Sequence, residues 1–183
     1  SNVSYSKSWA GKPFNFSANF RHSQNTQTNE IDLSLPEISF TVSRFYPFEK
    51  KEAVGSKKWY ENIGISYTLN GKNQLTTYDS LLFNKQTLNE FNSGIKHYIP
   101  ISTNIKLLKY VSLNPSINYT EYWYFNSSNI NWNYYSNSEE TDTLWHFNTA
   151  RDFNMNAQFT TKIYGTFQFN KKRLQAIRHV FTP

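Results

Sequence analysis

The sequence contains no cysteine, which excludes disulfide bonds and thiolate metal sites. It also has no run of about 18 apolar residues, so it encodes no membrane-spanning helix. Strands are not excluded from crossing a membrane, because each needs only about 9–11 residues and leaves no hydropathy peak. Charged residues make up 17% of the chain, below the roughly 25% of soluble domains. Aromatic residues reach 18%, which favours a strand-rich protein whose two faces meet different media.

The chain also lacks an initiating methionine and a recognisable signal peptide. It begins in "SNVSYSKSW" and ends in "AIRHVFTP", and both stretches are typical of strands. We therefore expect residues 1–183 to be a single region from inside a longer protein.

Motifs of known enzymes are missing. The sequence has no G-x-S-x-G, Walker loop or G-x-G-x-x-G pattern, and its four histidines do not have the spacing of metal ligands. The adjacent Glu139 and Glu140 would point apart on a strand, so they do not form a hydrolytic pair. We predict a protein that is not an enzyme and binds no cofactor or metal.

Alternation of apolar and polar residues is the strongest pattern present. In "RDFNMNAQFTTKIYGTFQFN", residues 151–170, the odd-numbered residues from Phe153 to Phe169 are mostly apolar and the even-numbered ones are polar. This period of two indicates an extended strand with two different faces. Similar segments begin near residues 3, 14, 31, 59, 95 and 111, and another begins near Ile177. The predicted fold class is all-β: an antiparallel up-and-down transmembrane β-barrel segment, about 7–8 strands of a larger barrel.

The third segment changes phase at Pro36. Its apolar residues occupy odd positions from Ile31 to Leu35 and even positions from Ile38 to Val42. A slip of one residue would exchange the two faces of a regular strand. We expect a β-bulge at Pro36 to absorb the extra residue, since proline is tolerated there.

The two faces of these strands differ in chemistry. One carries large aromatic and aliphatic residues, and the other carries Asn, Ser, Thr and Gln with few charges, as in a barrel with lipid outside and a wet lumen inside. The predicted lipid-facing residues are Phe14, Phe16, Phe20, Ile63, Ile65, Phe153, Phe159 and Ile163. The candidate lumen contacts for a phosphorylated ligand are Arg21, Arg44, Lys96 and Lys162, although a hydrated cation in a lumen needs no ligand.

Short and long connections alternate along the chain. The turns at "AGKP", "LLK" and "NKKRLQ" are short, and the connections at about 71–90 and 126–143 are long and polar. Outer-membrane barrels alternate in this way, with short periplasmic turns, although the connection at about 47–58 is long for that side. Aromatic residues gather at both predicted boundaries, where rings meet the bilayer interface. The predicted interface aromatics are Tyr46, Trp59, Tyr60, Trp123, Trp145 and Phe167.

The net charge of +6 suggests nucleic acid as a possible partner. Proteins that bind single strands interleave cations and stacking aromatics on one face. In this sequence the aromatics share a face with Ile and Leu, and the cations gather in turns. We therefore predict no nucleic-acid partner.

Four stretches carry a resemblance to a known family: "FNFSANFRHSQNTQTNEIDLSLPEISFTVSRFYPF", "VGSKKWYENIGISYTLNG", "SLNPSINYTEYWY" and "QAIRHVFTP". In this order they resemble the barrel part of LptD, the lipopolysaccharide-assembly outer-membrane protein family, also called organic-solvent-tolerance protein, in its Bacteroidetes-type form. The chain is thereby identified as an internal fragment.

The resemblance implies a function and a set of partners. It implies a very large barrel in the outer membrane of a Gram-negative bacterium, without enzymatic activity, that moves lipopolysaccharide to the outer leaflet. The implied partners are lipopolysaccharide, membrane lipids, an LptE-like plug lipoprotein in the lumen and the periplasmic lipopolysaccharide-transport bridge proteins. The disulfides of some family members do not carry over, because this chain has no cysteine.

Two alternatives are left open by the residues. One is another outer-membrane barrel, such as a porin, a nutrient transporter or a barrel lipase. The other is a secreted, soluble all-β domain that binds glycans. The sequence that flanks the chain would separate the first from the favoured interpretation, and behaviour without detergent would separate the second.

Overall fold

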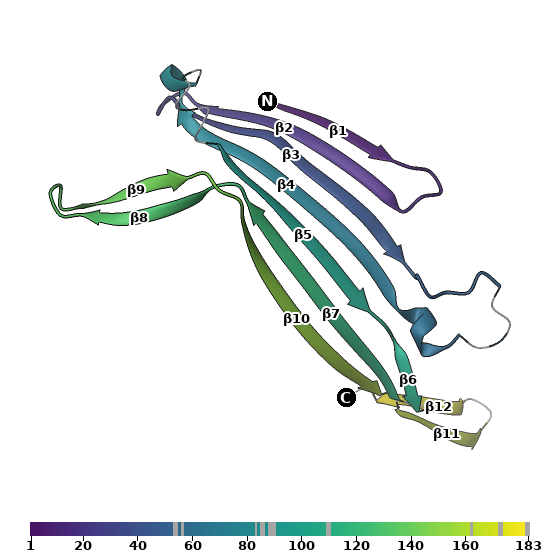
Figure 1. Ribbon diagram of the computed structural model, residues 1–183. Coiled ribbons are helices and arrows are strands. Elements are labelled where there is room, and N and C mark those ends of the chain that lie inside the picture. The colour runs from purple at the N-terminus through teal and green to yellow at the C-terminus, as the bar shows by residue number, and fades with distance from the viewer. Residues whose placement is uncertain are drawn as a thin grey trace. The chain divides into compact units, whose positions relative to one another are not determined.

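The structure is a computed structural model of the chain, drawn in Figure 1. It describes residues 1–52, 55, 57–82, 84, 87, 91–108, 111–161, 163–171 and 174–181. Within these ranges it does not describe the side chains of residues 108, 141–142, 163–164, 169–171, 174–177 and 181. No helix in the described part of the chain is long and apolar enough to cross a membrane.

Most of the described residues lie in strands, as the alternating sequence predicts. Two short 3₁₀ turns, η1 (Trp59–Asn62) and η2 (Asp79–Leu81), flank one of them. The strands are β1 (Asn2–Ser8), β2 (Phe14–Asn25), β3 (Glu30–Phe45), β4 (Gly64–Tyr78), β5 (Asn92–Ser102), β6 (Ile105–Leu108), β7 (Val111–Tyr124), β8 (Ser127–Asn133), β9 (Ser138–Leu144), β10 (Asn148–Thr161), β11 (Ile163–Lys171) and β12 (Leu174–Phe181).

Strands that follow one another in the sequence are neighbours in the sheet. Among the described residues, the largest sheet has the order β1–β2–β3–β4–β5–β7–β10, and β6 also pairs with β7. Two further sheets are the antiparallel hairpins β8–β9 and β11–β12. The all-β, antiparallel up-and-down fold expected from the sequence is therefore confirmed.

The chain divides into two compact units. Unit 1 comprises Ser1–Arg44, Ser66–Ile99 and Tyr119–Phe153. Unit 2 comprises Phe45–Ile65, Pro100–Asn118 and Asn154–Pro183. In unit 2, β6 pairs with the start of β7, and the Thr103 hydroxyl donates to the Trp59 carbonyl oxygen at 3.2 Å.

The register of β2 and β3 contains the predicted bulge. Ala18 lies opposite Ile38, but Arg21 lies opposite Ser34, so β3 supplies one residue more than β2 around Pro36. From Ile38 to Val42, even residues of β3 share a face with even residues of β2. From Ile31 to Leu33, odd residues of β3 share that face instead. This is how the apolar set keeps to one face although its phase changes in the sequence.

Several elements differ from what the sequence predicts. The segment expected to begin as a strand near residue 59 begins with η1, and β4 starts at Gly64. β4 continues to Tyr78, although residues 71–90 read as a polar connection. The connection at 126–143, expected to be a loop, contains the hairpin β8–β9. The long alternating stretch 151–170 contributes to two sheets instead of one, because β10 belongs to the largest sheet and β11 pairs with β12 in a separate one.

Few side chains are fully buried. Ile31 and Leu75 are the fully buried hydrophobic residues in the described part of the chain, and both lie in unit 1. Gly71 of β4 lies against the Ile38 side chain of β3, where a Cβ atom would come within 2.7 Å of Ile38 Cγ1. Glycine therefore lets a large aliphatic side chain of one strand lie over the backbone of the next.

Candidate functional site

A row of aromatic rings crosses five neighbouring strands of unit 1. The ring centroids of Phe14 and Phe40 lie 6.1 Å apart, and those of Phe40 and Tyr67 lie 6.4 Å apart. Farther along, the His97 and Trp123 rings approach to 4.2 Å between centroids. We call this set the aromatic row: Phe14, Phe40, Tyr67, His97, Trp123 and Phe147. It lies on the face that carries Ile38 and the other apolar residues.

Two members of the aromatic row are joined by a hydrogen bond. Tyr67 Oη and His97 Nδ1 are 2.8 Å apart, with the direction of donation set by the histidine tautomer. The other ring nitrogen, His97 Nε2, is buried and has no hydrogen-bond partner among the described residues. A polar pair thus lies in the middle of a face that the sequence predicts to be apolar.

A carboxylate joins β7 to β10 on the same face. Glu121 Oε2 accepts a hydrogen bond from Tyr119 Oη at 2.6 Å, and Oε1 accepts one from Trp123 Nε1 at 3.1 Å. The guanidinium Nε of Arg151 lies 3.4 Å from Glu121 Oε1. The carboxylate side chain is 19% exposed and that of Arg151 is 66% exposed, so the ion pair is open to its surroundings at the arginine.

Sequence reasoning missed these polar residues as a group. His97, Glu121 and Arg151 each replace an apolar residue at an odd position of its strand, and a single replacement looks like ordinary variation. The detectable signal was that three neighbouring strands of the predicted sheet carry such a replacement. No cluster of three or more His, Cys, Asp or Glu suited to a metal ion occurs in the described ranges.

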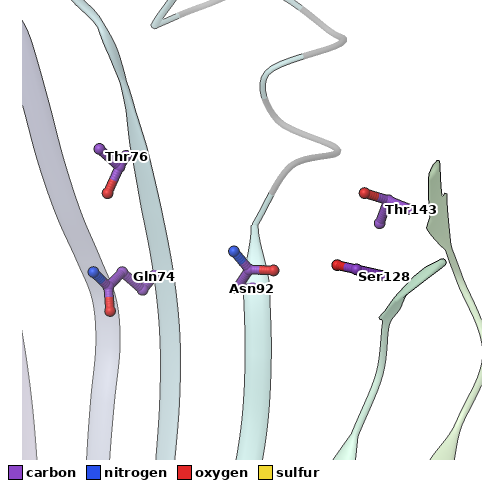
Figure 2. Close-up of a pocket in the computed structure, with 5 residues that line it drawn as sticks. All are labelled: Gln74, Thr76, Asn92, Ser128 and Thr143. Atoms are coloured by element: carbon purple, nitrogen blue, oxygen red, sulfur yellow. The ribbon is translucent and has the colours of Figure 1, made fainter. Parts of the chain in front are cut away.

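The opposite, polar face of unit 1 contains a cavity of about 410 Å³. Figure 2 shows Gln74 and Thr76 on β4, Asn92 at the start of β5, and Ser128 and Thr143 on the two strands of the hairpin β8–β9. We call it the hydroxyl–amide cavity, because all five lining residues carry a hydroxyl or an amide group. Its volume lies in the range of ligand-binding pockets, about 300–1,000 Å³.

Hydrogen bonds hold two of the lining side chains in place. The Thr76 hydroxyl donates to Asp32 Oδ1 at 2.7 Å, and Asn126 Nδ2 donates to Asn92 Oδ1 at 2.9 Å. The side chains of Gln74, Ser128 and Thr143 make no hydrogen bond to another residue that the structure describes. The sequence alone does not reveal this cavity, because its residues come from four strands spread over 70 positions.

The predicted lumen cations do not gather at this cavity. Arg21 lies opposite Asn2 and Ser34 in the sheet and is exposed. Lys96 Nζ lies 5.4 Å from the centroid of the Tyr122 ring. Arg44 is exposed near the end of β3, and Lys162 lies outside the described residues. A role for these four in binding a phosphorylated ligand stays a prediction.

The predicted lipid-facing residues vary in exposure. Phe14, Phe20, Phe153 and Phe159 are exposed, the last of them at 68%. Those that are half-buried are Phe16, Ile63 and Ile65. Ile163 begins β11, and its side chain is outside the described set. Lipid contact at these positions is not tested by the structure and stays a prediction.

The predicted interface aromatics occur in several elements. Trp123 belongs to the aromatic row, and the Trp59 and Tyr60 rings meet edge to face with centroids 6.0 Å apart. Those with exposed rings include Tyr46, Trp59, Trp145 and Phe167. In the same connection as Tyr46, the Lys57 ammonium forms an ion pair with Glu49, which raises the pKa of Lys57 above its ordinary value.

A family model matches the chain over its full length. The model of the family described as LptD protein matches residues 1–183, the whole chain. No curated protein and no solved structure matches the chain. The family resemblance drawn from the four sequence stretches is therefore confirmed.

Proposed function

The chain belongs to the LptD protein family, and from that premise we propose that it is part of the wall of an outer-membrane β-barrel that moves lipopolysaccharide to the outer leaflet. The family acts in lipopolysaccharide transport and assembly in the outer membrane of Gram-negative bacteria. We take residues 1–183 as a single region of that wall, in keeping with the match over the whole chain.

The observation that carries the proposal is the contrast between the two faces of unit 1. One face carries the aromatic row and the apolar residues beside it, and the other contains the hydroxyl–amide cavity. Exposing large rings of unit 1 such as Phe20 and Phe153 to water over a broad surface would be unfavourable, because apolar area gains free energy only when it leaves water. Lipid removes that cost on one face, and an aqueous lumen suits the other.

The mechanism needs no chemical step. The polar face gives sugar and phosphate groups a wet path, while the apolar face keeps the wall in hydrocarbon. We assign no catalytic residue, cofactor or metal. The partners proposed are lipopolysaccharide, membrane lipids, an LptE-like plug lipoprotein and the periplasmic lipopolysaccharide-transport bridge proteins.

Depletion of the full-length protein in its own bacterium tests the proposal. We expect newly made lipopolysaccharide to stop reaching the cell surface and to accumulate on the periplasmic side of the outer membrane. Delivery should recover when the wild-type gene is restored. The measurement is the surface-exposed fraction of labelled lipopolysaccharide. Unchanged lipopolysaccharide delivery, with altered uptake of small solutes instead, would refute the proposal in favour of a porin or transporter.

A further inference from the structure

The hairpin β8–β9 extends the hydroxyl–amide cavity with an apolar shelf. Its register pairs Ser128 with Thr143 and Trp132 with Glu139. Residues two apart on a strand share a face, as do cross-strand partners. Ile130 and Trp132 therefore lie on the same face of the hairpin as the cavity-lining Ser128 and Thr143, and their side chains are 63% and 48% exposed.

This combination of groups matches the chemistry of a sugar. A pyranose presents hydroxyls around its edge and C–H groups on its faces. Hydroxyl and amide side chains both donate and accept hydrogen bonds, which suits the edge. An exposed indole offers a flat apolar surface with a negative π face, which suits the C–H groups. Ser128 and Trp132 are four positions apart on β8, about 13 Å, so the ligand must be longer than one ring.

The charges around the cavity select against phosphate. Asp32 accepts the hydrogen bond of the lining Thr76, and Glu139 is the cross-strand partner of Trp132. Lys72, two residues before Gln74 on β4, is already paired with Glu37 at 3.5 Å between Lys72 Nζ and Glu37 Oε1. A phosphorylated sugar would meet carboxylates here without an uncommitted cation among the described neighbours named above.

We propose that the hydroxyl–amide cavity and the Ile130–Trp132 shelf bind a neutral oligosaccharide. Two sources supply this chemistry at a bacterial surface: the uncharged part of the lipopolysaccharide sugar chain, for which the inference rests on the proposed function, and free glycan from the surroundings. The site differs from the candidate lumen cations in both its residues and its preferred charge.

Titration calorimetry on the full-length protein in detergent tests the proposal with three probes. The first is the oligosaccharide released from the bacterium's own lipopolysaccharide and then dephosphorylated, the second is the same oligosaccharide with its phosphates, and the third is maltoheptaose. We expect at least one neutral probe to bind, and the phosphorylated probe to bind no more tightly than its dephosphorylated form. Binding of the first probe alone assigns the site to lipopolysaccharide, and binding of maltoheptaose assigns it to free glycan.

Variants of the hairpin locate the binding site. Trp132→Ala should weaken binding about tenfold, as loss of a central aromatic contact does elsewhere. Thr143→Val keeps the shape, removes one hydroxyl and should weaken binding about two- to tenfold. Asn131→Ala is the matched control, because Asn131 is adjacent to Trp132 in sequence but lies on the opposite face.

Three results would overturn the proposal: neither neutral probe binds, the phosphorylated probe binds more tightly, or Asn131→Ala weakens binding as much as Trp132→Ala. The gel mobility of each variant with and without heating shows that it is folded. Normal lipopolysaccharide delivery by a protein that binds no sugar would remove this inference and leave the proposed function standing. If depletion leaves lipopolysaccharide delivery unchanged but maltoheptaose binds, the proposed function is refuted and the sugar-binding inference stands.

Discussion

Gly71 is the position where one added methyl group should have the clearest effect on stability. An alanine Cβ there would lie 2.7 Å from Ile38 Cγ1 and 3.0 Å from Ile38 Cδ1, whereas ordinary contact begins at 3.4 Å. The Ile38 side chain would have to move by about 0.7 Å, the difference between 3.4 and 2.7 Å. A shift of residue 71 away from Ile38 is limited, because Ile95 of β5 lies on the other side, 3.8 Å from the same Cβ position.

The expected loss of stability for Gly71→Ala is about 1–2 kcal/mol. Overpacking of this kind costs about 1–3 kcal/mol, and the reduced entropy of the unfolded chain returns about 0.4–1 kcal/mol. For 150–250 residues each kcal/mol lowers the unfolding midpoint by about 2–4 °C, and by less in a longer protein, so we expect a fall of at most about 8 °C. The assay is thermal unfolding of the full-length protein in detergent, followed by circular dichroism.

Two controls make the test specific. Gly94→Ala, on the neighbouring strand, would bring its Cβ no closer than 3.5 Å to the Trp123 carbonyl oxygen, so it should leave the midpoint unchanged or slightly raised. Ile38→Ala removes both crowded atoms, so Gly71→Ala should have no further effect in that background. An equal fall for Gly71→Ala and Gly94→Ala, or the same fall with Ile38 absent, would refute the packing argument.

Three further substitutions test the faces and the bulge. Phe159→Lys should cost about 2–4 kcal/mol if the residue meets the middle of a bilayer, whereas Gln158→Lys on the opposite face should cost far less; equal yields of folded protein in the outer membrane would contradict lipid contact. The Glu121 carboxylate is contacted by the donors of Tyr119, Trp123 and Arg151. Glu121→Leu removes both acceptor oxygens and should lower the unfolding midpoint more than Glu121→Gln, which keeps one oxygen. Equal shifts would show that the acceptor is unimportant. Deletion of Pro36 should abolish assembly by exchanging faces, while Pro36→Ala, which keeps the residue count, should assemble better; similar yields would argue against the bulge.

The sequence was sufficient to predict the long alternating strands of the largest sheet, because period two depends only on local alternation. The phase change at Pro36 could be converted into a bulge, since only an extra residue keeps both apolar runs on one face. The end of β4 was harder to predict from the sequence, because "QLTTY" is mostly polar although Leu75 and Thr77 are buried. The hairpin β8–β9 was masked by Asn and Ser, even though asparagine at Asn137 suits the positive φ of its turn.

The alternation of apolar and polar residues does not predict which strands pair with one another. Nothing in residues 151–170 marks the change from β10 to β11, because the pattern continues unbroken while the partner strand changes. The hydroxyl–amide cavity likewise depends on which strands adjoin, and Ser128 is 54 residues from Gln74 in sequence. His97, Glu121 and Arg151 became a cluster only when sheet order placed their strands side by side.

The aromatic row has a consequence for depth in the membrane. Its rings step across the sheet from β2 to β7, four strand spacings or about 19 Å. The line is not perpendicular to the strands, because Phe14 lies opposite Val42 while Phe40 lies opposite Phe16. In a wall of tilted strands, a diagonal offset of this kind decides whether rings on successive strands keep one depth or change depth from strand to strand. The composition also changes along the row, from Phe14 and Phe40, with hydrocarbon rings only, to Tyr67 and Trp123, whose polar atoms are bonded to His97 and Glu121.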